Sequence, residues 1–176
     1  MGYTVYKVEH IDTHGGSIRV YVGRTHKNID SSVEQFLVEE DTFGLKSFST
    51  YLNFAKRIEE AKRNTLANLQ NLKDQGITIV GYGSPAKATT VLNYYGITSD
   101  SISYLVEDNS LKHNKIVPGV RIPIVSKDRL GDGVPKIVLV MAWNFYEEIK
   151  RKNENYINEG IQFINIKELA ETKIPQ

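Results

Sequence analysis

The feature that most constrains the fold is residues 79–87, IVGYGSPAK, where an apolar strand runs into two glycines and then into the start of a helix. Ile77–Val80 form a β-rich run after the turn residues Gln75 and Gly76. Gly81 and Gly83 can adopt positive φ and bring backbone N–H groups close to a ligand. The sequence therefore predicts a sharp strand-to-helix turn.

The start of this helix has the chemistry of an anion site. Ser84 is a suitable N-cap, and Pro85 fits the first helical position. Free N–H groups at a helix start favour a phosphate or carboxylate. Lys87 in the first turn is unfavourable by about 0.3–1 kcal/mol unless a negative group compensates. The alternative is a tight turn without a ligand, because the third small residue of the dinucleotide fingerprint is replaced by Ala86 or Lys87.

Strands and helices alternate after Gly76, which predicts a parallel sheet with helices on both faces. We expect a Rossmann-like, three-layer α/β domain. The remaining expected strands are Ser103–Val106, Ile122–Val125, Ile137–Met141 and Ile161–Ile164, and the expected helices are 84–95, Phe145–Glu159 and Lys167–Glu171, with a short turn at Lys127–Leu130.

The first third of the chain predicts a small β element and two helices. Tyr3–Val8 and Ser17–Gly23 alternate as strands, and 31–43 has helical spacing with Ser31 or Ser32 as cap. Ser47–Lys73 predicts an amphipathic helix roughly 40 Å long. Packing on the sheet is favoured over a coiled coil. We expect residues 1–45 to pack on a main domain, 46–176, in one structural unit.

Residues at the carboxyl ends of the strands are candidates for ligand contacts, because doubly wound sheets bind ligands there. Glu107 or Asp108 could hold a ribose, or could form a solvated acidic turn. Trp143, the sole tryptophan, is expected in the core rather than as a stacking platform. Asn144 could cap the next helix or contact a ligand.

A second polar cluster, residues 9–17, contains two histidines, two acids and two hydroxyls. His10 and His14 would share one face of a helix, but the glycines that follow and the flanking strands argue against a helix there. We expect no metal site. A histidine beside glycines can serve as a base or hydrogen-bond donor in a cleft, and a solvated turn is the alternative.

Composition limits the classes of function. The 22 Lys and Arg nearly balance the 21 Asp and Glu, which does not favour a nucleic-acid partner. The absence of cysteine excludes disulfides, cysteine–zinc sites and thiol catalysis in this chain. No apolar run approaches the roughly 20 residues of a membrane span. We expect a cytoplasmic protein with no membrane partner.

Several motifs occur in order along nearly the whole chain: 14–19 (HGGSIR), 81–90 (GYGSPAKATT), 92–97 (LNYYGI), 106–109 (VEDN), 118–124 (PGVRIPI) and 142–145 (AWNF). Together they resemble the C-terminal domain of S-adenosylmethionine-dependent sugar C-methyltransferases. This resemblance implies a three-domain enzyme with an N-terminal zinc-binding domain, a central domain that binds S-adenosylmethionine, and a Rossmann-like C-terminal domain that helps enclose a nucleotide-linked keto-sugar. It also implies a role in deoxysugar biosynthesis.

In that family a base removes the proton beside the keto group, and the enolate attacks the donor methyl. We expect this chain to be an excised or stand-alone C-terminal domain that binds no S-adenosylmethionine itself and does not methylate alone. Its expected partners are a nucleotide-sugar and the zinc-binding and S-adenosylmethionine-binding domains, with a homodimer possible. The catalytic residues are not assigned.

The expected ligand-binding residues are His14, Gly15, Gly16, Ser17, Arg19, Gly81, Gly83, Ser84, Pro85, Lys87 and Asn144. Two alternatives stay open. One is a binding or scaffold module that docks other domains through its long helix. The other is a stand-alone nucleotide-binding domain, which requires Glu107 or Asp108 to face the glycine loop.

Overall fold

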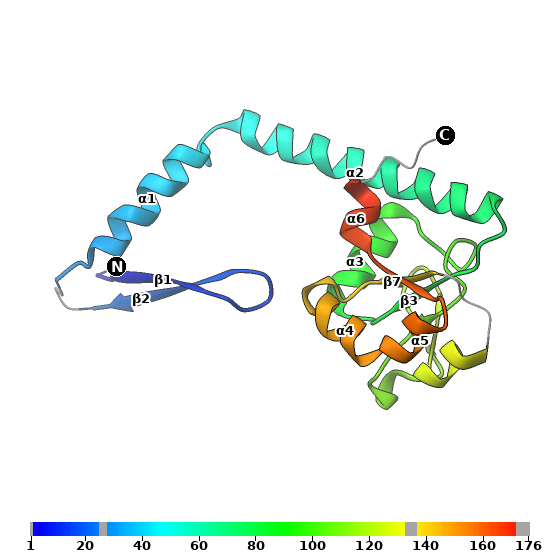
Figure 1. Cartoon of the computed structure of the whole chain (residues 1–176). Coiled ribbons are helices and arrows are strands. Elements are labelled where there is room, and N and C mark those ends of the chain that lie inside the picture. Colours follow the sequence, from blue (N-terminus) through cyan, green and yellow to red (C-terminus); the bar gives the residue numbers. More distant parts are fainter. Residues whose placement is uncertain (1, 25–27, 133–136, 172–176) are drawn as a thin grey trace. The chain divides into compact units, whose positions relative to one another are not determined.

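The chain divides into two compact units, Met1–Arg57 and Ile58–Gln176, and the boundary falls within helix α2, Phe48–Asp74. The computed structural model describes residues 2–24, 28–132 and 137–171. Figure 1 shows the elements of each unit.

The first unit contains a two-stranded antiparallel hairpin, β1 (Thr4–Ile11) and β2 (Ser17–Gly23), followed by α1 (Ser31–Phe43). Both strands and the helix were predicted. The predicted cap was wrong, because the carboxylate of Asp30 accepts the Ser32 N–H at 2.9 Å and acts as the N-cap. The Ser32 hydroxyl instead accepts the N–H of Val8 at 3.1 Å and holds α1 on β1.

The second unit is built on a six-stranded sheet in the order β5-β6-β4-β3-β7-β8, parallel except for β5. This confirms the predicted Rossmann-like α/β fold. The strands are β3 (Ile79–Tyr82), β4 (Leu105–Val106), β5 (Lys115–Ile116), β6 (Pro123–Val125), β7 (Ile137–Val140) and β8 (Gln162–Asn165). β3 lies between β4 and β7, so the strand order reverses beside it.

Two buried clusters cover the two faces of this sheet. One joins the strands to the second half of α2, to α3 (Ala86–Tyr95) and to α6 (Ile166–Glu171). The other joins them to the 3-10 helix η2 (Lys127–Asp132) and to α4 (Tyr146–Lys152). Continuous apolar strands such as β3 and β7, buried at every position, are typical of a sheet covered on both faces.

Helix α2 packs through its C-terminal half. Leu69 and Leu72 enter the first cluster, and the amide of Asn68 donates to the Leu169 carbonyl at 2.7 Å. Phe48 and Leu52, near the start of the same helix, are exposed. The predicted packing on the sheet is therefore confirmed only beyond the unit boundary. No helix of the described residues combines the length and apolarity needed to cross a membrane.

Two parts of the second unit differ from the prediction. The expected helix Phe145–Glu159 is divided into a 3-10 turn η3 (Trp143–Phe145), α4 and α5 (Glu154–Asn158). Asn153 interrupts it, because this buried residue donates its side-chain amide to the Ile149 carbonyl at 2.6 Å. The short edge strand β5 was not predicted. It follows another short 3-10 turn, η1 (Ser110–Lys112).

Substitution of Leu69 by alanine tests the packing of α2. Leu69 is 2% exposed, so we expect the free energy of unfolding of the second unit to fall by about 2–5 kcal/mol. The measurement is denaturant unfolding followed by the fluorescence of Trp143, which packs against the same cluster. Leu52→Ala is the matched control on the same helix, because Leu52 is 47% exposed. Equal effects of the two substitutions would contradict this description of α2.

Candidate functional site

The glycine loop after β3 lies between the loops that follow β4 and β7. The N–H of Gly83 donates to the Val106 carbonyl at 2.7 Å, at the end of β4. On the other side, a Cβ added to Gly83 would lie 2.9 Å from Cβ of Ala142, just after β7. Gly83 also has a φ of 87°. Both the close approach and the left-handed backbone therefore require glycine at this position.

Glu107 reaches into the glycine loop from the end of β4. Its Oε2 accepts the backbone N–H of Ser84 at 2.9 Å and the Ser84 hydroxyl at 2.5 Å. Lys112 donates to the same oxygen at 3.1 Å and to the Ser84 carbonyl at 3.1 Å. The other oxygen, Oε1, accepts the N–H of Asn109 at 3.2 Å. A carboxylate of the protein itself is therefore the anion bound at Ser84.

These contacts also set the protonation of Glu107, whose side chain is 12% exposed. Burial on its own raises the pKa of the Glu107 carboxyl, but the hydrogen bonds from Ser84, Lys112 and Asn109 outweigh it and hold the pKa below its ordinary value. The side chain is therefore ionised at neutral pH. We call Ser84, Glu107, Asn109 and Lys112 the Glu107 cluster.

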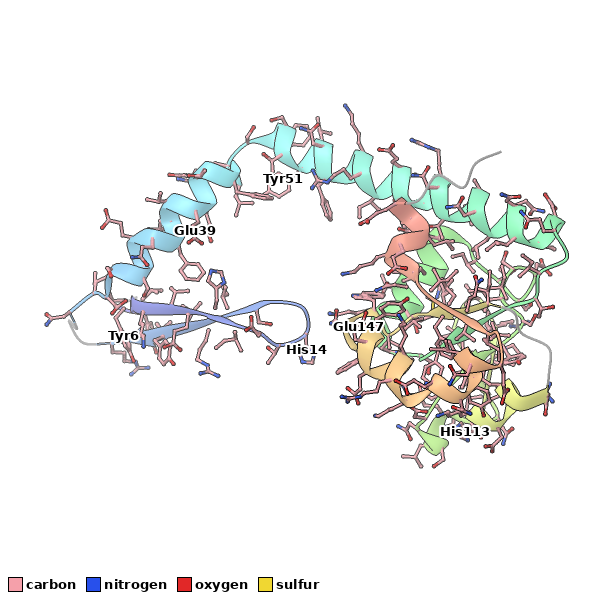
Figure 2. All side chains as sticks on the ribbon, viewed as in Figure 1. Tyr6, His14, Glu39, Tyr51, His113 and Glu147 are labelled. Atoms are coloured by element: carbon pink, nitrogen blue, oxygen red, sulfur yellow. The ribbon has the colours of Figure 1, made fainter. Side chains whose placement is uncertain are left out.

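Two neighbours extend this polar edge. The hydroxyl of Tyr82 donates to Oδ1 of Asp108 at 2.7 Å, and burial followed by this hydrogen bond raises the pKa of Tyr82 well above its ordinary range. Nε2 of His113 lies 2.7 Å from the Glu107 carbonyl oxygen. Figure 2 labels His113 in the loop after η1. Both contacts fix the conformation of the loop that carries Glu107.

The predicted residues of the second unit all lie at or near this edge. Gly81 is buried in β3, and Lys87 is exposed in the first turn of α3. The predicted cap was wrong: Pro85 is the N-cap, its ring has no group that could make a side-chain capping bond, and the Ser84 hydroxyl donates to Glu107 instead. Asn144 caps no helix and is exposed within η3. Trp143 is partly buried against the first cluster, as expected.

The predicted residues of the first unit share one turn and one strand. His14, Gly15 and Gly16 have φ of 55°, 87° and 110° in the turn between β1 and β2, and Figure 2 labels His14 there. The Ser17 hydroxyl donates to the Thr13 carbonyl at 3.1 Å. This geometry confirms the turn and excludes a helical face shared by His10 and His14.

Arg19 lies on β2 opposite Glu9 of β1, and its Nη1 is 3.9 Å from Oε2 of Glu9. Lys7 lies 2.6 Å from the other carboxylate oxygen, and the Tyr21 hydroxyl donates to Oε2 at 2.8 Å. Hydrogen bonds from Lys7 and then Tyr21 lower the pKa of Glu9, despite the exposure of the group. Arg19 therefore belongs to an open, solvated charge cluster.

Sequence reasoning missed Lys112, which completes the Glu107 cluster. Its signal was weak, because a lysine five residues after an acid is common in loops. An open depression of about 540 Å³ on α4 and α5 was also not foreseen, and none of its residues was predicted as a ligand contact. It is lined by Glu147, Glu148, Lys150, Arg151, Glu154 and Ile157.

Comparison with known proteins gives two matches. Residues 12–166 match the family described as C-methyltransferase C-terminal domain. The C-methyltransferase NovU of Streptomyces niveus is 32% identical over 165 residues, which cover 93% of this chain and 39% of that protein. The chain thus spans about two-fifths of the length of this relative.

Replacing Glu107 by glutamine tests the pKa argument. The folded-state pKa is below the unfolded value near 4.5, so ionised Glu107 stabilises the fold above that value. This contribution is lost as the pH falls through the folded-state pKa. We therefore expect the free energy of unfolding to decrease less between about pH 7 and about pH 3 in Glu107→Gln than in the wild type.

The measurement is denaturant unfolding at a series of pH values. Glu148→Gln is the matched control, because the pKa of Glu148 is also lowered, by its hydrogen bond with Lys152, but the pair is exposed. Exposed ion pairs contribute little to the free energy of unfolding, so Glu148→Gln should keep the pH dependence of the wild type. An unchanged pH dependence in Glu107→Gln would show that the Glu107 contacts are not made in solution.

Proposed function

The chain belongs to the family of C-methyltransferase C-terminal domains, and from this premise we propose that it is the substrate-side domain of an S-adenosylmethionine-dependent C-methyltransferase that acts on a nucleotide-linked keto-sugar. Transfer of a methyl group to carbon requires a carbon nucleophile. A base supplies it by removing the proton beside the keto group. The carbon of the resulting enolate would attack the methyl group of S-adenosylmethionine as the bond from that methyl to sulfur breaks and S-adenosylhomocysteine leaves. We assign this base to no residue of this chain.

The observation that supports a substrate-side role is the occupation of the glycine loop by Glu107. The Ser84 N–H and hydroxyl already bind Oε2, and Oε1 accepts from Asn109. A methyl donor bound in a Rossmann loop needs a carboxylate with free oxygens for its ribose. The residues present do not fit S-adenosylmethionine here, and we propose that another part of the enzyme binds it.

The proposed substrate contacts are the exposed start of α3 and the turn of the hairpin. The first turn of α3 carries Lys87, which attracts the phosphates of a nucleotide-linked sugar. His14–Arg19 offer a histidine, a hydroxyl and a guanidinium beside two glycines with positive φ. Such groups bind hydroxyls and phosphates without steric hindrance from a Cβ.

One observation favours a second candidate, a nucleotide-binding domain of another enzyme class. That function requires Glu107 or Asp108 to face the glycine loop, and Glu107 does so. However, its oxygens bind the protein's own donors, and Asp108 accepts from Tyr82. A ribose would have to displace Lys112 and Ser84, whose hydrogen bonds to Glu107 are partly buried.

A thermal-shift titration of the chain with a nucleoside-diphosphate keto-sugar, S-adenosylmethionine or NAD tests the proposal. A ligand at 100 times its dissociation constant stabilises by about 2.7 kcal/mol. We expect a shift with the keto-sugar nucleotide alone, a smaller one in Lys87→Ala, and the full shift in the control Lys56→Ala. We also expect no methyl transfer by the chain alone.

The other possible results of this titration would each favour a different function or contact. A shift with NAD would favour the nucleotide-binding alternative, and a shift with S-adenosylmethionine would place the donor in this chain. Failure of the keto-sugar nucleotide to stabilise the chain would contradict the substrate-side role. An equal loss of the shift in Lys56→Ala would remove Lys87 as a specific contact.

A further inference from the structure

The first unit has almost no core of its own. Among its described residues, 2–24 and 28–57, Val8 alone is buried, and α1 contributes no buried residue. The strand β2 exposes Ile18, Val20 and Val22 by 54%, 45% and 51%. A two-stranded hairpin is marginally stable unless another surface packs against it, and α1 leaves these three side chains exposed.

The exposed apolar residues of β2 share one face of the hairpin. The register places Val20 opposite Val8 and Ile18 opposite His10, so these side chains project from the same face. Helix α1 covers the β1 side of this face, where the ring of Phe36 lies 4.4 Å from that of His10. The β2 side is left open. The opposite face carries the polar residues around Glu9.

The backbone edge of β2 is open as well. On the outer edge of β1, the Tyr6 carbonyl accepts the N–H of Asp30 at 2.8 Å, and Val8 donates to Ser32. β2 pairs with β1 and with no other strand in the described part of the chain. Arg19 is the one charged residue among its seven. A long apolar edge with so little charge is suited to pairing with another strand.

The comparisons indicate what covers this edge. The family match begins at residue 12, in the turn of the hairpin, so β2 lies inside the matched domain and β1 precedes it. The hairpin therefore lies where the match to the family begins. This chain spans 39% of the Streptomyces niveus relative, which leaves about three-fifths of that enzyme to provide a partner.

We propose that β2 pairs through its free edge with an edge strand of a β-sheet in the remaining part of the C-methyltransferase, whichever polypeptide carries that part. Ile18, Val20 and Val22 then pack against the apolar layer that covers this sheet. We call Ser17–Gly23 with these three side chains the docking edge. The inference rests on the proposed function, because it takes the partner from the same enzyme.

Amide hydrogen exchange tests the docking edge. The matched segment of the Streptomyces niveus enzyme is replaced by this chain, and exchange of residues 17–23 is compared between the chimera and the isolated chain. We expect exchange at least tenfold slower in the chimera. Val22→Asp should reverse this protection in the chimera, and Leu111→Asp, at an exposed apolar residue of the second unit, should not.

Hydrogen exchange does not depend on activity, so failure of the docking edge can be distinguished from failure of the proposed function. Slow exchange in an inactive chimera supports the docking edge and counts against the proposed function, and fast exchange in an active chimera does the reverse. Protection that rises with the concentration of the isolated chain would identify a second copy as the occupant and overturn the proposal. Protection of residues 17–23 in the dilute isolated chain would place the occupant within this chain and overturn it too.

A chimera that does not fold is replaced by the intact Streptomyces niveus enzyme. Exchange is then measured in the strand aligned with β2, and in a variant with aspartate at the position aligned with Val22. Slow exchange that the aspartate reverses supports the docking edge, and fast exchange in the unmodified enzyme overturns it.

Discussion

The charge on Glu107 is the constraint on which the carboxyl edge of the sheet depends. A carboxylate that is 12% exposed is costly to bury, and it remains ionised because Ser84, Lys112 and Asn109 all donate to it. These donors come from the loop after β3, from η1 and from the turn before it. One side chain therefore ties together the segments that surround the start of α3. Removal of any donor leaves a partly buried charge less well compensated.

The parallel sheet of the second unit could be predicted from the sequence, whereas the partner of Ser84 could not. Apolar strands alternating with helices predict the parallel sheet because both faces of each strand must be buried, as at Ile79 and Val80, which enter opposite clusters. The role of Ser84 could not be predicted in the same way. A serine before a proline at a helix start has the local signature of a cap, but its actual partner, Glu107, is brought to it by the pairing of β3 and β4.

The other features that the sequence did not predict have separate causes. Strand β5 forms because Lys115 and Ile116 pair with β6, and so short a pairing leaves no periodic pattern in the sequence. The break between α4 and α5 falls at Asn153, a weak helix former whose side chain bonds to the Ile149 carbonyl. The spacing in α2 correctly predicts an apolar face. Spacing alone does not state which part of that face is covered, and only the part with Leu69 and Leu72 is buried.

The Glu107 cluster and the exposed charges around Glu9 are suited to different tasks. Lys112 donates to two oxygen acceptors, one of them on the Glu107 carboxylate, which is 12% exposed, so moving Lys112 to a ligand would leave that charge less well compensated. Arg19 is 3.9 Å from Glu9 in an exposed cluster, where solvent screens the pair and its net contribution is small. An anionic ligand can therefore recruit Arg19 at little cost, whereas Lys112 is committed to the fold. A phosphate that binds this chain is then expected at exposed cations such as Arg19 or Lys87 rather than at Lys112.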